Sequence, residues 1–81
     1  MSAEEIFDKV QDIVAEQFSV ERDEVRMDSV LEEDLGADSV DLVELVMAME
    51  EEFDIGEIDE EDLQSLKTVG DCVRYLSNHI E

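Results

Sequence analysis

The chain has 81 residues, which suits one small domain, and we expect residues 1–81 to form a single domain. Asp and Glu number 26 against 5 Lys and Arg, giving a formal net charge of −21. This charge excludes binding to a nucleic-acid backbone, which needs a basic surface, and argues against docking on an anionic membrane. The longest uninterrupted apolar run, residues 45–49, is too short to cross a bilayer.

Other general features favour a folded protein of the cytoplasm. Apolar residues make up 43% of the chain and recur with helical spacing, unlike those of a disordered acidic protein. The start, residues 1–5, has neither the basic nor the apolar region of a signal peptide. Cys72 is the only cysteine, which excludes an intrachain disulfide and a four-cysteine zinc site. We therefore expect a protein of the reducing cytoplasm. We also expect it to be a monomer.

The first predicted helix runs from Ala3 to about Phe18. Ser2 and Glu5 form the pattern of a capping box at its start. Its apolar residues share one face, and they are Ile6, Phe7, Val10, Ile13, Val14 and Phe18. The next twenty or so residues, 19–38, show no sustained period. A loop of this length in a compact domain is often functional.

The second predicted helix starts at Asp38 or Ser39, with Asp38 as N-cap, and runs to about residue 53. On a helical wheel the residues of its core stripe lie within about 60° of Leu42, and they are Leu42, Leu45, Val46, Met49 and Phe53. A second set of apolar residues lies outside that stripe, beside acidic residues, and this set is Val40, Val43 and Met47. Either these residues are incidental surface, or they anchor a partner whose basic residues meet the surrounding acids.

The last two predicted helices are a short one from about Asp59 to Leu66, capped by Asp59, and one from Val69 to about His79. No segment alternates like a strand. The sequence therefore predicts an all-α fold, a small four-helix bundle with one short helix and a long loop between helices 1 and 2.

Ser39 stands in the first turn of the second helix, where a side chain projects off the helix end. A phosphate ester there would lie near the positive end of the helix dipole. A serine is also an ordinary residue for a first turn, so its position alone leaves both interpretations open.

The residues around Ser39 resemble the attachment motif of bacterial-type acyl carrier proteins. Residues 34–40 read Asp-Leu-Gly-Ala-Asp-Ser-Val, and an acidic helix follows them through Phe53. The resemblance extends to the first helix, the long loop and the Thr68–Asp71 start of the last helix. The chain departs from the family in two places. Val40 stands where the family usually has Leu, and residues 55–59 lack the usual Pro and carry one extra residue.

The resemblance implies that a separate, magnesium-dependent phosphopantetheinyl transferase esterifies Ser39 with 4′-phosphopantetheine from coenzyme A. The protein itself is then not an enzyme and has no catalytic residues. The thiol of the arm carries a growing fatty acyl chain as a thioester and presents it to fatty acid synthesis enzymes with basic docking patches. The expected partner contacts are Asp38, Val40, Asp41, Glu44, Met47, Glu50 and Glu51. The expected lining of the acyl-chain cavity is Leu45, Val46, Met49, Phe53, Leu66, Cys72 and Tyr75.

Three other functions fit an acidic chain of this kind to different degrees. An EF-hand calcium site fails, because counting back from each glycine puts Leu31, Phe53 or Lys67 at a ligand position. Looser divalent binding by the acidic residues remains open. An acidic mimic of nucleic acid fits the composition, and carriers of polyketide, aminoacyl or D-alanyl groups share the serine. We expect no metal site, a core role for Cys72 and a surface position for His79.

Overall fold

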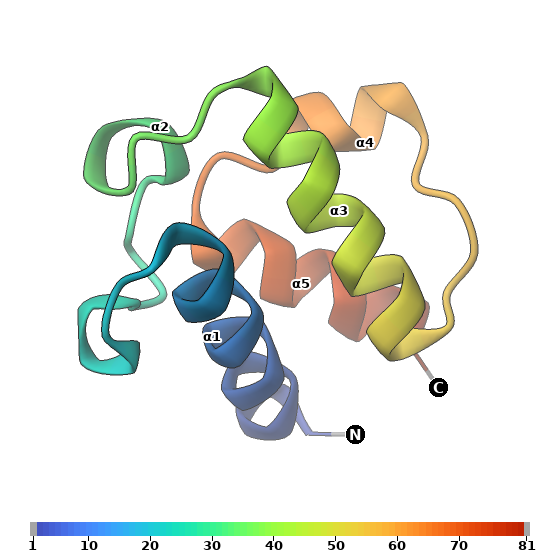
Figure 1. The fold of residues 1–81 in the computed structure, drawn as a ribbon. Coiled ribbons are helices and arrows are strands. Elements are labelled where there is room, and N and C mark those ends of the chain that lie inside the picture. The colour runs from blue at the N-terminus through green and yellow to red at the C-terminus, as the bar shows by residue number, and fades with distance from the viewer. Residues whose placement is uncertain (1, 81) are drawn as a thin grey trace.

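The computed structural model describes residues 2–80 and consists of five α-helices and one turn of 3₁₀-helix (Figure 1). In chain order they are α1 (Ala3–Phe18), η1 (Arg22–Glu24), α2 (Leu31–Asp34), α3 (Ser39–Phe53), α4 (Glu60–Ser65) and α5 (Val69–His79). No named strand occurs among these residues. The all-α prediction is confirmed, and the four predicted helices correspond to α1, α3, α4 and α5.

Each of the three long helices begins with a capping box, in which the N-cap side chain and the third helical residue exchange hydrogen bonds. The pairs are Ser2 with Glu5, Asp38 with Asp41, and Thr68 with Asp71. The short helix differs, because Asp59 takes the N-cap position of α4 without making a capping hydrogen bond. Asp59 therefore stands at the predicted N-cap position of α4, but its side chain does not make the predicted capping hydrogen bond.

The core lies where α1 packs against α5 and α3 (Figure 1). The predicted stripes of α1 and α3 contribute to it, together with residues of α5. Its buried helical residues are Ile6, Val10, Val14, Leu45, Val46, Met49, Val69, Cys72, Val73 and Leu76. The short helix α2 adds Leu31, and the connecting segments add Val25, Ala37 and Leu66. The segments between the helices are therefore part of the packed structure.

The long segment between α1 and α3 is held against the start of α5. Gly70 N donates to Met27 O at 2.8 Å, and Val69 N donates to Ser29 O at 3.0 Å. These bonds satisfy two N–H groups that a helix start leaves without an intrahelical partner. Leu31 N in turn donates to Lys67 O at 2.9 Å. The predicted loop is thus an ordered segment that contains η1 and α2 and sets the position of α3.

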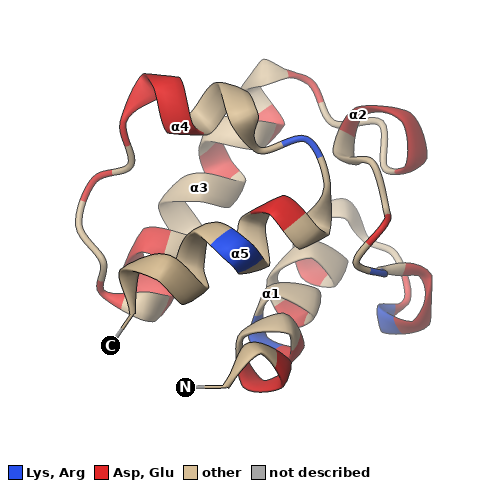
Figure 2. Cartoon of the chain, turned by 180° about the vertical axis from the view of Figure 1, so that it is seen from behind, with Lys and Arg blue, Asp and Glu red and all other residues tan. Residues whose placement is uncertain are grey.

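The same segment is also fastened to α1. Arg22 pairs with Asp8 and, at 2.9 Å, with Asp12. Gln11 Nε2 donates to Arg22 O at 2.8 Å and to Val25 O at 3.0 Å. Figure 2 shows why such pairs are few, since Asp and Glu occur on every helix and Lys and Arg are scattered singly.

Candidate functional site

Ser39 is the first residue of α3, and its side chain is exposed. The turn from α2 into α3 requires Gly36, whose φ of +68° is a conformation that other residues adopt at a cost. Ala37 follows, buried, and its N–H donates to Leu31 O at 2.9 Å. This turn fixes the direction in which α3 starts, and Asp38 caps it as predicted.

The Ser39 hydroxyl is available for covalent attachment. Asp38 Oδ1 accepts from Asp41 N at 3.0 Å, and Asp41 Oδ2 accepts from Asp38 N at 3.1 Å. The cap is therefore complete without Ser39, and within residues 2–80 the Ser39 hydroxyl has no hydrogen bond. A phosphate ester at this atom displaces no internal contact and lies at the positive end of the α3 dipole. The residues present fit a phosphopantetheine group.

A cleft of about 660 Å³ adjoins Ser39, between α2, the first half of α3, and α4. Figure 1 shows α4 lying near the start of α3. The side chains facing the cleft include Leu42, Val43, Leu63 and Leu66. Glutamates of α2 and α4, together with Lys67, line it as well. An apolar wall with a polar rim beside the serine suits an arm that has polar and apolar parts.

The predicted acyl-chain lining forms a closed cluster. Leu45, Val46, Met49, Leu66 and Cys72 are buried, and Phe53 and Tyr75 pack against them, partly exposed. Leu66 is the one member of this set that also lines the cleft. Their role as an acyl cavity therefore stays a prediction, because it requires the helices to part.

Burial has a clear effect on Cys72. It raises the pKa of the Cys72 thiol to about 12, and the nearby Asp71 carboxylate adds to the rise. The thiol is therefore protonated at neutral pH. Such a cysteine acts as a small apolar residue rather than a nucleophile.

The sequence did not identify Leu63 as a cleft residue. It is the only apolar residue within α4, and it lines the cleft opposite Leu42 and Val43. A lone apolar residue in a short acidic helix was the available signal, since such a residue must be the one that packs.

The predicted partner surface on α3 is exposed. Val40, Met47 and Val43 have 63%, 58% and 45% of their surface accessible, which is unusual for apolar residues of a helix in a small protein. Glu44 and Glu51 beside them are exposed too. An apolar set surrounded by carboxylates suits a docking site. The docking role itself stays a prediction.

Three acids of the predicted contact set make hydrogen bonds within the protein. Asp38 and Asp41 form the cap of α3. Glu50 Oε2 accepts a hydrogen bond from Ile58 N at 2.7 Å and so tethers the segment before α4. Sequence reasoning missed this tether, because Glu50 and Ile58 are brought together by the turn between them.

Two further predictions concern His79 and metals. His79 is exposed at the end of α5, where its ring stacks on Tyr75 with centroids 4.0 Å apart. In the described part of the chain no group of three His, Cys, Asp or Glu side chains is placed to hold a metal ion. No helix there is long and apolar enough to cross a membrane.

Comparisons with known proteins agree with this site. The family model described as "Phosphopantetheine attachment site" matches residues 8–76. The acyl carrier protein of Clostridium perfringens is 51% identical over 76 residues, which cover 94% of this chain and 99% of that protein. The acyl carrier protein of Clostridium acetobutylicum is 49% identical over 76 residues, covering 94% and 97%.

A solved structure shares the fold as well. The acyl carrier protein from Enterococcus faecalis superposes with a TM-score of 0.80 at 37% sequence identity, and the match covers 98% of this chain and 99% of that one. Sequence, fold and the free serine at the start of α3 therefore agree, and this chain belongs to the family of acyl carrier proteins, which bear a phosphopantetheine attachment site.

Proposed function

We propose that the protein carries fatty acyl groups on a 4′-phosphopantetheine arm attached to Ser39 Oγ and presents them to fatty acid synthesis enzymes. The observation that carries the proposal is the exposed Ser39 hydroxyl, which has no hydrogen bond within residues 2–80 and lines a cleft with an apolar wall. When bound, the arm supplies a thiol that holds the acyl group as a thioester. The chain itself supplies the attachment point, the shelter and the docking surface.

The shelter starts at the cleft. The apolar surface next to Ser39 is formed by Leu42, Val43 and Leu63. Leu66 lines the same cleft and is also buried in the core. We include the predicted core residues in the proposal as the inner lining reached when the helices part. Burying about six methylenes contributes roughly 5 kcal/mol at about 0.8 kcal/mol each, before the cost of opening the core. A chain held this weakly is retained in transit and released to an enzyme.

The docking surface consists of Val40, Val43 and Met47 with the acids around them. The net charge of −21 attracts a basic patch over a distance, so rising salt should slow association with a partner enzyme. The apolar contact area is small, which suits brief visits to several enzymes. The proposal also takes the protein to be a monomer of the cytoplasm that is a substrate of the transferase and has no catalytic activity.

The proposal is tested by chain elongation on the loaded protein. The arm is attached with coenzyme A and a promiscuous phosphopantetheinyl transferase, and the product is incubated with purified bacterial fatty acid synthesis enzymes and their substrates. Intact mass should reveal acyl groups growing by two carbons per cycle on the wild type. Ser39→Ala should show none, whereas Ser77→Ala, which alters an exposed serine of α5, should behave as the wild type.

The competing cargoes give a different result. If the arm-bearing protein accepts no two-carbon extension but is loaded by an aminoacyl- or D-alanyl-activating enzyme, the fatty acid assignment is wrong. If polyketide-type unreduced products accumulate instead, the cargo class changes while the carrier role stands.

A further inference from the structure

The cleft beside Ser39 contains one basic residue. Among the described residues, Lys67 is the one Lys or Arg that lines this cleft. It belongs to the connection between α4 and α5, and the sequence has no other Lys or Arg between Arg26 and this residue. The other charged residues of the cleft are Glu32, Glu33 and Glu60. An anion attached to Ser39 therefore meets several carboxylates and a single cation in this cleft.

The main chain of Lys67 is fixed on both sides. Its carbonyl accepts from Leu31 N at 2.9 Å, and its N–H donates to Asp71 Oδ2 at 3.1 Å. The carbonyl of Leu31 in turn accepts from Ala37 N at 2.9 Å, shortly before Ser39. Successive backbone hydrogen bonds thus connect Lys67 to the turn that starts α3. They hold Lys67 beside the same cleft that Ser39 lines.

The side chain of Lys67 is available to pair with an anion. It is exposed, and within residues 2–80 its ammonium group forms no ion pair, although glutamates line the same cleft. Lys9, Arg22 and Arg74, in contrast, each pair with a carboxylate. A lysine holds its charge at the end of a flexible stem, so the ammonium group can turn toward an anion without any change in the main chain.

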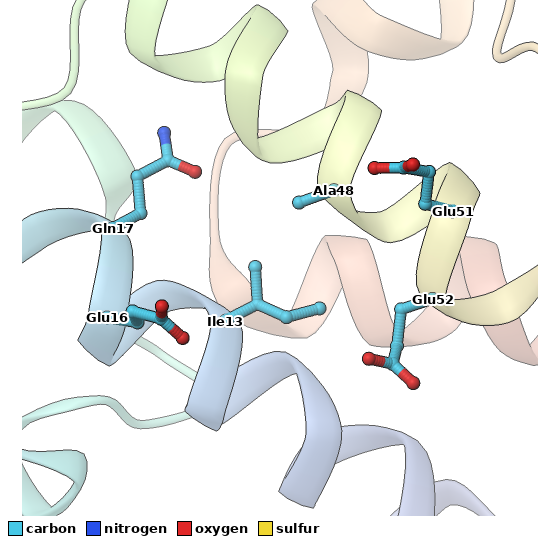
Figure 3. Close-up of a pocket in the computed structure, with 6 residues that line it drawn as sticks. All are labelled: Ile13, Glu16, Gln17, Ala48, Glu51 and Glu52. Atoms are coloured by element: carbon cyan, nitrogen blue, oxygen red, sulfur yellow. The ribbon is translucent and has the colours of Figure 1, made fainter.

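The hollow between α1 and α3 offers no such group. It has a volume of about 480 Å³, and Figure 3 shows the residues that line it. These residues are apolar, acidic or neutral, namely Ile13, Ala48, Glu16, Glu51, Glu52 and Gln17. A phosphate group would meet carboxylates there, and none of the described residues that line the hollow is a Lys or Arg. The cleft beside Ser39 is therefore the better place for an anion.

We propose that Lys67 is a positioning residue for the arm, and that its ammonium group pairs with the phosphodiester attached to Ser39. This inference rests on the proposed carrier function. The phosphodiester is negatively charged, so an ammonium group that meets it forms a charge-assisted hydrogen bond. The pairing favours an arm that lies across the cleft, toward Leu63 and Leu66, over an arm that extends into solvent. An exposed ion pair shifts such a balance only about threefold, so an enzyme can still withdraw the arm.

The test compares arm-bearing proteins by NMR, without a partner enzyme. The arm is attached to the wild type, Lys67→Gln and Lys67→Arg. Cross-relaxation between the paired methyl groups of the arm, which lie near its phosphodiester, and the methyl groups of Leu63 and Leu66 should weaken by up to about threefold in Lys67→Gln. Lys67→Arg should restore it. The phosphorus signal of the arm should move in Lys67→Gln, and salt should move the wild-type signal in the same direction.

Lys9→Gln is the matched control. It removes the same charge from a lysine of α1 that does not line the cleft. The contacts of the arm and its phosphorus signal should then remain those of the wild type. Lys67→Arg separates a lost charge from a disturbed fold, because it changes the side chain and keeps the charge. Lys67→Gln keeps the main-chain hydrogen bonds of residue 67, so its Tm should stay close to that of the wild type.

Three outcomes would overturn the proposal. The first is that the wild type and Lys67→Gln show the same arm contacts and the same phosphorus signal. The second is an equal change in Lys9→Gln. The third is a change in Lys67→Gln that Lys67→Arg also shows. A protein that gains the arm and gives one of these results loses only the role of Lys67, whereas failure to gain the arm removes the carrier function itself.

Discussion

Gly70 offers a sharp test of how the long segment between α1 and α3 is held. It is buried in the first turn of α5, and its N–H donates to Met27 O at 2.8 Å. A Cβ built on Gly70 would lie 2.8 Å from that same carbonyl oxygen. The oxygen belongs to the main chain of a segment that is itself tied to α5 through Ser29. Gly70→Ala therefore forces two tethered backbones apart.

The magnitude follows from three opposing contributions. Overpacking costs about 1–3 kcal/mol, and weakening the Gly70–Met27 hydrogen bond costs about 1 kcal/mol. The higher helix propensity of alanine returns at most about 1 kcal/mol. The net loss is about 1–3 kcal/mol, and each kcal/mol lowers Tm by roughly 4–8 °C in a domain of this size.

The measurement is thermal and urea unfolding followed by circular dichroism. Ser77→Ala is the matched control, because it places the same alanine at an exposed site of α5 and should stay within about 0.5 kcal/mol of the wild type. A Gly70→Ala protein as stable as the wild type, or more so, would refute the argument. The close approach of Met27 to α5 would then not limit this position.

Four other predictions concern charge, docking and cargo. Burial alone would raise the pKa of Asp71, but hydrogen bonds from Thr68 and Lys67 and its pairing with Arg74 hold that pKa below its usual value. Its stabilising contribution is therefore fully present above the unfolded-state pKa of about 3.9 and is lost as pH falls through the lowered pKa of the folded state. Asp71→Asn should lower Tm at neutral pH, and its gap to the wild type should narrow as pH falls through that lowered pKa, whereas a constant gap would contradict this. Raising salt to about 1 M should raise the wild-type Tm by screening the repulsion among the acids, whereas a fall in Tm would show that the ion pairs matter more. Met47→Ser should lower the transferase kcat/KM about fivefold, the effect of roughly 1 kcal/mol, with Tm unchanged, and unaltered kinetics would remove Met47 from the docking surface. An eight-carbon acyl chain on the arm should raise Tm and shift NMR signals of Leu66, Cys72 and Tyr75, and unchanged shifts there would contradict the inner cavity.

Local signals account for most of the fold. The caps formed by Ser2, Asp38 and Thr68 mark where α1, α3 and α5 begin, because each needs only a residue three positions away. The core stripes follow helical spacing and all pack together in the structure. The motif around Ser39 was equally local, so the candidate attachment residue was identified from the sequence.

Long-range contacts account for the rest. The order of the segment 19–38 depends on hydrogen bonds to Lys67, Val69 and Gly70, which no local pattern contains. The inward turn of Glu50 toward Ile58 and the place of Leu63 opposite α3 depend on how α4 packs. The sequence therefore indicated which residues carry the chemistry, and the structure was needed to show which acids are free to meet a partner.

The central claim is that Ser39 holds the phosphopantetheine arm. It is tested most directly by intact mass and peptide mapping after incubation with coenzyme A, Mg²⁺ and a promiscuous phosphopantetheinyl transferase. The account predicts a gain of one phosphopantetheine, located on the peptide that contains Ser39 and lost in Ser39→Ala but kept in Ser77→Ala. An unmodified wild type with an active transferase, or a modification that maps to another residue, would contradict it.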